Sequence, residues 1–343
     1  MRTAAALDEV LLWIGTAPPD DGTPHTGRTS GDAGSRHTDE VSVEERAARY
    51  TPMPPRWPME ALVVPQAVRD ELLLAIETIQ LETLVFDTWG LRAIEPFPRS
   101  ALNFHGAPGT GKTLAAHGVA TQLGAPILVA SYAQIESMYH GEGPKNVEAL
   151  FHAAQRDGAV LFIDEADSLL SRRLTHVTQG SEQAINSMRS QLLICLEQYR
   201  GVVIFATNLV ANYDPAFETR VRHIHFPLPD VPAREAIWRI HLPSTLPLSG
   251  DVDIPALAQV EAEFCGRDIK NAVIDAALTV ARHGRPQVTQ QDLLDAIARI
   301  VTARNALRPA ETPAPASPEM ADRIRTAVAA SDTTDTESVT VHL

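Results

Sequence analysis

One eight-residue segment limits what this chain can fold into more than any other feature. The apolar run ALNFH (101–105) leads directly into GAPGTGKT (106–113), and a helical pattern follows over 112–123. A strand, a loop of the form GxxxxGK(S/T) and a helix, in that order, make a phosphate-binding loop, because backbone N–H groups and the positive helix end both face the phosphate. A glycine-rich turn without a ligand is the alternative, and eight matching positions argue against it.

The side chains of this loop have separate expected roles. Lys112 is placed to contact the β- and γ-phosphates of ATP, and the hydroxyl of Thr113 is placed to bind Mg²⁺. We therefore expect ATP and Mg²⁺ as cofactors. The loop residues expected to bind nucleotide are Gly106, Ala107, Pro108, Gly109, Thr110, Gly111, Lys112 and Thr113.

Two acidic residues follow a second apolar run, VLFIDEAD (160–167). Asp164 ends the predicted strand, where its carboxylate can hold the hydration shell of Mg²⁺, and Glu165 is placed to polarise a water for attack on the γ-phosphate. Acids at a strand end can also simply cap the next helix. Because a phosphate loop precedes them, we predict a catalytic role for Glu165 and a metal-binding role for Asp164.

Asn208 ends a third apolar run, VVIFATN (202–208). An asparagine after a strand is often only a turn residue. In a parallel sheet, however, the ends of neighbouring strands meet at one edge, so Asn208 is expected near the acidic pair as a sensor of the γ-phosphate.

Strand-like and helical patterns alternate through the centre of the chain and predict an α/β fold with a five-stranded parallel sheet flanked by helices. After Pro229 the pattern is helical only, with Thr289 as an expected N-cap, which indicates a small all-helical unit. The five predicted strands are 101–105, 126–130, 159–163, 201–207 and 223–226; the later helices are 232–241, 254–260, 266–283 and 289–302.

The two ends of the chain differ in composition from its centre. Residues 1–56 are expected to be mostly disordered, and residues 304–343 form a Pro/Ala/Thr-rich tail with the same expectation, because neither offers enough apolar surface to offset its ordering entropy. A formal charge of −14 argues against nucleic acid as the main partner. The two cysteines lie in apolar helical patterns, and no run reaches membrane length, so a cytoplasmic protein is expected.

These elements, in this order, resemble the AAA+ ATPases. The branch that contains katanin and spastin is the most similar, followed by the FtsH-like ATPase module. Besides the segments above, SMYHGEGPKNVEALF (137–151) and the stretch DPAF (214–217) with its following arginines carry the likeness. The resemblance covers about 57–303 and implies a large nucleotide-binding domain at 57–228 and a helical lid domain at 229–303.

The resemblance implies further site residues. Arg220 matches the arginine finger that reaches the γ-phosphate of a neighbouring subunit, and Arg222 matches its companion, although the spacing differs from the family and leaves open which one acts. Surface arginines on an edge strand are the alternative. Arg267, at the start of a lid helix, matches the family's second sensor, whereas a solvated arginine is the plain alternative. The apolar segment 62–65 resembles the adenine contact, and 89–91 is expected to pack at a hinge.

Tyr139, His140 and Gly141 match the aromatic–hydrophobic–glycine loop that lines the central pore of the family's rings. An aromatic ring beside a flexible glycine suits sequence-independent contact with a peptide, whereas a buried tyrosine anchor is the alternative. His140 departs from the family, which carries an aliphatic residue there. The segment 171–182 has the polar character of a second pore loop.

The resemblance therefore implies an ATP-hydrolysing motor that assembles with itself, as an expected hexamer, and remodels, unfolds or disassembles an unknown protein substrate through a central pore. A nucleotide-controlled scaffold that hydrolyses ATP without threading is the first alternative, and a DNA-directed ATPase similar to helicase loaders is the second. No HExxH motif is present, so the zinc-protease chemistry of FtsH-like relatives is not expected.

Overall fold

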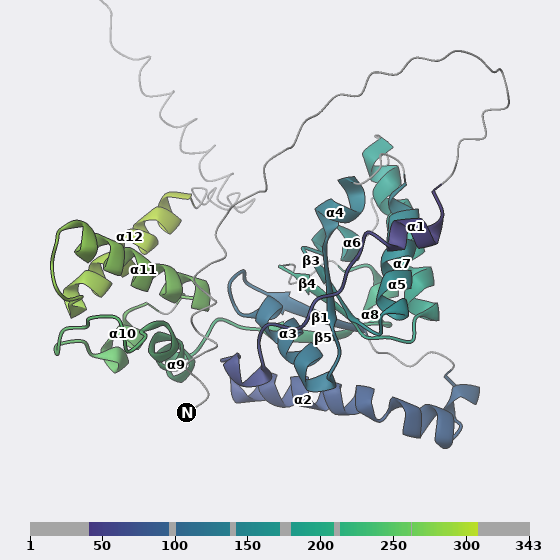
Figure 1. Cartoon of the computed structure of the whole chain (residues 1–343), viewed down its shortest axis with the longest axis horizontal. Helices are drawn as coiled ribbons and strands as arrows, with labels where there is room; N and C mark the ends of the chain where they lie inside the picture. The colour runs from purple at the N-terminus through teal and green to yellow at the C-terminus, as the bar shows by residue number, and fades with distance from the viewer. Residues whose placement is uncertain are drawn as a thin grey trace, which may run out of the picture. The chain divides into compact units, whose positions relative to one another are not determined.

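A computed structural model provides the fold of the chain between residues 41 and 307 (Figure 1). The tail beyond residue 307 and the first 40 residues lie outside the part of the chain that is described. The described residues are 41–95, 101–137, 142–171, 180–208, 213–261 and 263–307.

The centre of the fold is a sheet of five parallel strands in the order β2-β3-β4-β1-β5. The α/β class and the five parallel strands expected from the sequence are confirmed. Because β1 is flanked by β4 and β5, the glycine-rich loop after β1 lies beside the ends of both neighbours. The strands are β1 (Ala101–Gly106), β2 (Ile127–Ser131), β3 (Val160–Asp164), β4 (Val203–Thr207) and β5 (Arg222–Phe226).

Helices cover both faces of the sheet, so the apolar strands are buried on two sides. One core joins one sheet face to α5 and α7, and a second joins the other face to α2 and α3. The helices of this domain are α1 (Val43–Ala47), α2 (Gln66–Gln80), α3 (Lys112–Leu123), α4 (Tyr132–Ser137), α5 (Gly143–Arg156), α6 (Asp167–Leu170), α7 (Gly180–Gln198) and α8 (Pro215–Glu218), with short turns η2 (Met59–Ala61), η3 (Thr83–Thr88) and η4 (Leu91–Ala93).

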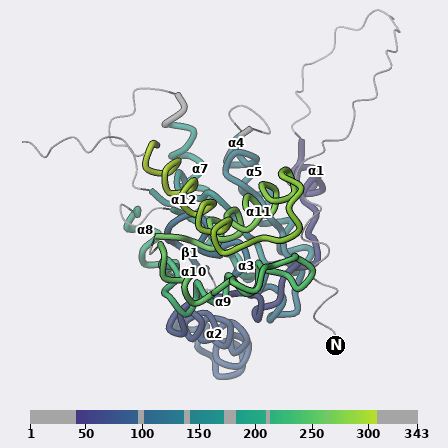
Figure 2. Tube along the Cα trace, turned by 90° about the vertical axis from the view of Figure 1, so that its left-hand side faces the viewer, coloured from purple at the N-terminus to yellow at the C-terminus, as the bar shows by residue number. Residues whose placement is uncertain are grey.

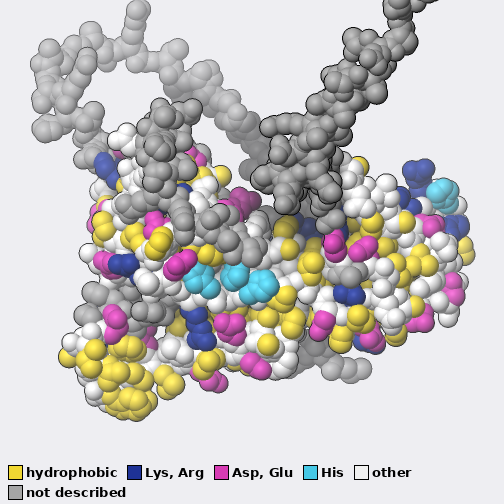
Figure 3. All heavy atoms as spheres, turned by 180° about the vertical axis from the view of Figure 1, so that it is seen from behind, with side chains coloured by type: hydrophobic (Ala, Val, Ile, Leu, Met, Phe, Trp, Pro, Cys, Tyr) yellow, Lys and Arg dark blue, Asp and Glu magenta, His cyan; other side chains and the backbone are white. Residues whose placement is uncertain are grey.

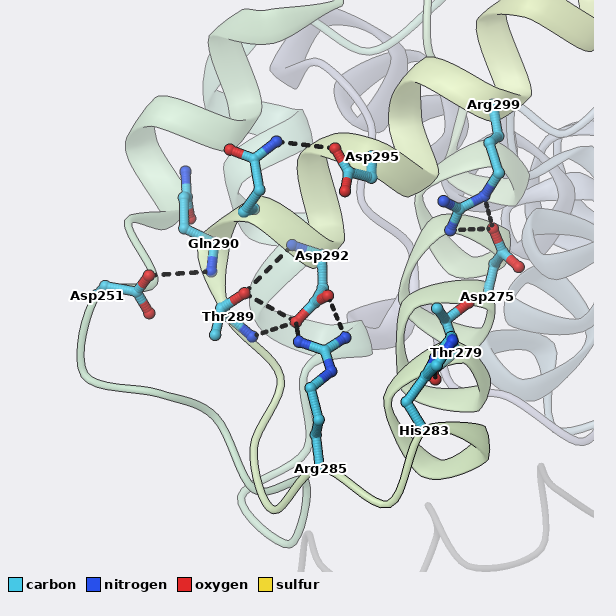
Figure 4. A network of polar contacts seen from close by, with 11 residues as sticks. Asp251, Asp275, Thr279, His283, Arg285, Thr289, Gln290, Asp292, Asp295 and Arg299 are labelled. Atoms are coloured by element: carbon cyan, nitrogen blue, oxygen red, sulfur yellow. Dashed lines mark hydrogen bonds and ion pairs between the residues drawn. The ribbon is translucent and has the colours of Figure 1, made fainter.

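Four helices after β5 form the helical unit, with Trp238 and Phe264 buried in its own core. They lie together as one group (Figure 2). The expected cap at Thr289 is present: its Oγ1 accepts from the backbone N–H of Asp292 over 3.3 Å. Its own N–H and hydroxyl donate to the Asp292 carboxylate over 3.0 and 2.7 Å, and Arg285 binds the same carboxylate (Figure 4). Arg285 and these bonds hold the pKa of Asp292 well below its usual value. The helices are α9 (Val231–His241), α10 (Ile254–Val260), α11 (Gly266–Arg282) and α12 (Gln290–Leu307).

The described part of the N-terminal segment is folded, which its composition did not indicate. Residues 41–56, expected to be mostly disordered, are ordered against the sheet domain. Ser42 and Glu45 form a capping box at α1, Tyr50 is 8% exposed, and Met53 pairs with Ile127 at the start of β2. A few well-placed anchors therefore order a segment whose composition alone offers little apolar surface.

The segment 89–91 does not pack as expected. Trp89 is 64% exposed and Ile94 is 85% exposed; Leu74 on α2 and Leu81, directly after α2, are 52% and 50% exposed. Figure 3 shows hydrophobic side chains gathered at this end of the molecule, at its lower left. The expectation of hinge packing at 89–91 is therefore wrong. Among the described helices, none has the length and apolar character needed to cross a membrane.

Candidate functional site

The glycine-rich loop depends on backbone geometry that other residues cannot adopt. Gly106 has φ +145°, and a Cβ there would lie 2.2 Å from the carbonyl oxygen of Phe226 on β5. Gly109 has φ +82°, in the left-handed region where L side chains are strained. The loop therefore curls directly off the end of β1 into α3, as the sequence predicts.

Lys112, the first residue of α3, turns back over the loop and is 8% exposed. Its ammonium donates to the carbonyl oxygens of Gly106 and Ala107 over 2.7 and 3.0 Å and to Oδ1 of Asn208 over 3.0 Å. Burial lowers the pKa of Lys112, an effect that the nearby carboxylates of Asp164 and Asp167 oppose. The structure thus brings the predicted lysine and the predicted sensor asparagine into direct contact.

Thr113 and Asp164 lie side by side at the mouth of the loop. The hydroxyl of Thr113 is 3.4 Å from Oδ2 of Asp164, and Thr113 is exposed. A hydroxyl and a carboxylate oxygen are the donors that Mg²⁺ prefers, and Mg²⁺ keeps several waters when few protein ligands are present. These two residues therefore fit a partly hydrated magnesium ion.

Glu165 occupies a strained backbone position directly after β3. Its φ is +55°, and it is the sole residue other than glycine with positive φ in the described part of the chain. Its N–H donates to Oδ1 of Asp164 over 2.9 Å, and the following N–H, of Ala166, donates to the carbonyl of Ala206 over 2.9 Å. These bonds fix a sharp turn that leaves the Glu165 side chain exposed. Strain of this kind clusters at functional sites.

Asp167 joins the acidic turn to the asparagine strand. Its Oδ1 accepts from the hydroxyl of Thr207 over 2.6 Å and from the backbone N–H of Asn208 over 2.9 Å. Asp167 begins α6, and Asn208 follows β4, so one carboxylate ties the ends of two neighbouring strands together. The role of Asp167 is not visible in the sequence, where only its place in the run DEAD marks it, because its partners Thr207 and Asn208 are at and after the end of another strand.

The start of α11 lies against the glycine-rich loop. A Cβ placed on Gly109 would lie 2.5 Å from Sγ of Cys265 and 2.8 Å from Cβ of Arg267. Arg267 is exposed and close enough to Lys112 to lower its pKa. The structure therefore brings the predicted Arg267 to the loop, and it adds Cys265, which the sequence analysis treated only as a helix residue.

The apolar segment 62–65 lies next to the phosphate loop. Leu62 is 1% exposed, and its Cδ1 would lie 3.1 Å from a Cβ on Gly111, while Val63 packs on the core of the helical unit. The segment thus connects the loop with that unit, at the place where an adenine contact is expected.

The two predicted finger arginines lie away from this cluster. Nη2 of Arg220 is 2.6 Å from Glu197 on α7, and its Nη1 donates to the carbonyl of Ala216 over 2.9 Å. Arg222 begins β5 and pairs with Leu102, near the amino end of β1, whereas the glycine-rich loop follows the carboxyl end. Within one chain, therefore, neither arginine joins Lys112, Asp164 and Asn208.

The expected pore-loop residues Tyr139, His140 and Gly141 lie outside the described residues, as does most of the second expected loop, 172–179. The flanking helices are described: α4 ends at Ser137 and α5 begins at Gly143.

A group of histidines beside the loop was not anticipated. His105, which precedes Gly106, stacks on His225 with ring centroids 5.0 Å apart, and His223 lies 6.2 Å from His105. Asn103 and Tyr213 complete the group on one face of β1 and β5, where Figure 3 shows histidine side chains gathered. Burial and the neighbouring histidines lower the pKa of His105 to about 4.

Two family models match the chain in agreement with these features. The model for the ATPase family associated with various cellular activities (AAA) matches residues 102–228, and the model for the AAA+ lid domain matches residues 251–295. The first match contains the sheet and its phosphate loop; the second contains α10, α11 and part of α12.

Curated relatives give the same result. The chain is 36% identical to a proteasome-activating nucleotidase of Saccharolobus islandicus over 220 residues, covering 62% of this chain and 55% of the relative. It is 39% identical to the ATP-dependent zinc metalloprotease FtsH 3 of Sphaerobacter thermophilus over 212 residues, 60% and 42% of the two chains. A 26S proteasome regulatory subunit 4 homolog of Oryza sativa subsp. japonica is 34% identical over 239 residues, 67% and 52%.

The chain spans about half the length of the curated relatives it matches. The expected likeness to FtsH-type ATPases is confirmed, and the chain is also similar to proteasomal ATPases. The parallel sheet, the phosphate loop on β1, the following helical unit and both family matches lead to one conclusion: this chain belongs to the AAA+ ATPases, with an AAA domain followed by an AAA+ lid domain.

Proposed function

We propose that the chain binds ATP with Mg²⁺ and hydrolyses it at the loop after β1. Lys112 and the loop N–H groups bind the phosphates, Thr113 and Asp164 hold the metal, and Glu165 orients and deprotonates the attacking water. Asn208 senses the γ-phosphate. The observation that carries this proposal is the 3.0 Å bond between Lys112 and Asn208, since it joins the phosphate loop to the end of β4.

The hydrolytic site is completed by a second copy of the chain. Arg220 and Arg222 lie away from the site of their own chain, so a γ-phosphate that they contact belongs to a neighbour, where an arginine stabilises the charge of the transferring phosphoryl group. Repetition of such a head-to-tail contact closes into a ring. We propose a hexamer, in which Arg267 reports the nucleotide state from the lid.

The work done with ATP is remodelling of a protein substrate. Supporting this are relatives whose names place them at the proteasome or in an ATP-dependent protease. Tyr139, with His140 and Gly141, is the proposed substrate contact at the central pore. The net charge of −14 supports protein rather than nucleic acid as the partner. Both cysteines are free thiols, which supports a reducing, cytoplasmic location.

The Glu165→Gln variant tests this proposal. It should bind ATP as the wild type does, stall hydrolysis and hold substrate in a stable complex that a pull-down recovers. Lys112→Ala, which loses nucleotide binding, is the matched control and should recover nothing. Normal phosphate release by Glu165→Gln would overturn the assigned base.

A second substitution separates a motor from a nucleotide-controlled scaffold. Tyr139→Ala should leave basal ATP hydrolysis intact and abolish disassembly of the captured substrate, because only the pore contact is removed. If disassembly continues at the wild-type rate, the result supports a nucleotide-controlled scaffold and contradicts threading through a pore.

A further inference from the structure

The contact between the lid and the phosphate loop is narrow. It is made by the start of α11, where Cys265 is 6% exposed and its Sγ occupies the space over Gly109. A Cβ on Gly266 would lie 3.5 Å from the carbonyl oxygen of Gly109. Since a helix N-terminus favours negative charge, the exact placement of this first turn affects the phosphates nearby.

Asp268, in the first turn of α11, fixes the backbone at this contact. Its Oδ2 accepts from the backbone N–H of Cys265 over 3.0 Å. The same oxygen accepts from Nη2 of Arg304 on α12 over 2.6 Å. One carboxylate oxygen therefore links Cys265, which touches the phosphate loop, to Arg304 near the C-terminal end of α12.

Arg304 makes two further contacts with the segment that precedes α11. Its Nη1 donates to the carbonyl of Glu263 over 3.1 Å, and its guanidinium carbon lies 5.3 Å from the ring centroid of Phe264. Phe264 is 2% exposed in the lid core. Arg304 thus contacts the residues just before Cys265 and, through Asp268, Cys265 itself.

A second arginine on α12 makes a comparable pair in a different place. Arg299 binds Asp275 on α11 over 2.8 Å (Figure 4). Its side chain is 49% exposed, against 28% for Arg304. Both pairs join α11 to α12, but only the pair of Arg304 and Asp268 reaches the turn that lies on the phosphate loop.

We propose that Arg304 is a positioning residue for the nucleotide site: through Asp268 it holds the first turn of α11, with Cys265 and Arg267, over the phosphate loop. This inference rests on the proposed binding of ATP at that loop. Arg304 itself touches no nucleotide. Its loss leaves the lid core in place but frees the turn that closes on Gly109.

The test uses the full chain and its own thiol. In a Cys195→Ala background, Cys265 is the only cysteine, and its rate of maleimide labelling reports whether the start of α11 covers the loop. The rate is measured with and without a non-hydrolysable ATP analogue and Mg²⁺, together with kcat, KM for ATP and the melting temperature. Arg304→Gln is compared with Arg299→Gln.

In the parent protein, the analogue should slow labelling of Cys265. Arg304→Gln should lose this protection and raise KM for ATP by about tenfold, the effect expected from one lost charge-assisted hydrogen bond, with a smaller change in kcat. Arg299→Gln should keep protection and KM within about twofold of the parent. Arg304→Lys, which keeps the charge, should lie between the two.

Three results would overturn the proposal. They are retained protection and KM in Arg304→Gln, equal losses in both arginine variants, and a parent protein that binds ATP without any protection of Cys265. A parent protein that binds no ATP instead contradicts the proposed function. If Arg304→Gln does not fold, Asp268→Asn decides by the same criteria, since it keeps a cap oxygen but loses the charge that Arg304 binds.

Discussion

The guanidinium of Arg46 lies 2.7 Å from the carboxylate of Glu142. Arg46 is on α1, in the N-terminal segment that the sequence left unstructured, and Glu142 directly precedes α5. The side chain of Arg46 is 3% exposed and that of Glu142 is 31% exposed. Asn146, which accepts a weaker 3.4 Å bond from Arg46, donates in turn to the carbonyl of Ile135 on α4. The N-terminal segment therefore contacts the start of α5 and, through Asn146, is linked to α4.

The unequal burial of this pair predicts unequal effects of removing its two members. Glu142→Ala leaves a buried guanidinium without its carboxylate and should lower the free energy of unfolding by about 3 kcal/mol. Arg46→Met leaves a carboxylate that water can reach and should cost about 1 kcal/mol. Urea unfolding measures both values, and the reverse order would contradict the pairing described.

The histidine group predicts a loss of stability in weak acid. Burial holds the pKa of His105 at about 4, below the value near 6.5 of an unfolded histidine. The unfolded chain therefore binds more protons between these pH values. The contribution of His105 to the free energy of unfolding is fully present above about pH 6.5 and is lost as the pH decreases toward 4. His223, His225 and Lys112 face His105 and strengthen this effect.

The measurement is urea unfolding at a series of pH values. His105→Asn should flatten the dependence between pH 6.5 and 4, whereas His152→Asn, at an exposed position on α5, should leave the wild-type slope. An unchanged slope in His105→Asn would show that other groups carry the acid sensitivity.

Asp167 should matter for turnover more than for affinity. Asp167→Ala frees Thr207 and the backbone of Asn208, and a small displacement of a catalytic group costs up to about 100-fold in rate. We expect kcat for ATP hydrolysis to fall about 10- to 100-fold, with KM nearly unchanged. Thr207→Val removes only the bond from the Thr207 hydroxyl and should give a smaller loss. A rise in KM alone, with kcat preserved, would contradict this assignment.

Gly109→Ala should abolish nucleotide binding for two separable reasons. The φ of +82° costs an alanine about 1–2 kcal/mol, and its Cβ would also collide with Cys265. Gly124→Ala is the control for backbone strain outside the phosphate loop, since Gly124 follows α3, has φ +66° and has no heavy atom within 4 Å of the added Cβ. Calorimetry with ATP should show binding in Gly124→Ala and none in Gly109→Ala. Equal affinity in both variants would contradict the predicted role of Gly109.

The parts of the fold that the sequence predicts correctly depend on local patterns. The five strands are short apolar runs, and the phosphate loop is a contiguous motif whose flanks are visible in the sequence. Asp164 ends β3 and Asn208 follows β4, and these two strands pair in parallel, so both residues lie at the same edge of the sheet, as the strand order predicts. Each of these inferences needs only neighbours along the chain or the order of strands.

The features that sequence reasoning missed are pairs between distant residues. Arg46 and Asn146 are 100 positions apart, Asp167 acts on another strand, and Cys265 reaches the phosphate loop from the lid. The prediction of disorder for 41–56 was wrong for the same reason, because the residues that hold this segment lie on α5 and β2. The prediction for 89–91 was wrong in the opposite sense: packing was expected there, but Trp89 is 64% exposed.

The central claim, that ATP is hydrolysed at a site completed by a second copy of the chain, is tested most directly by phosphate release per protomer as a function of protein concentration. With saturating Mg²⁺ and ATP, the specific activity should rise with protein concentration and reach a plateau, because Arg220 or Arg222 reaches the γ-phosphate only after assembly. A specific activity that is the same in dilute monomer as at high concentration would contradict the claim, as would the absence of phosphate release at every concentration.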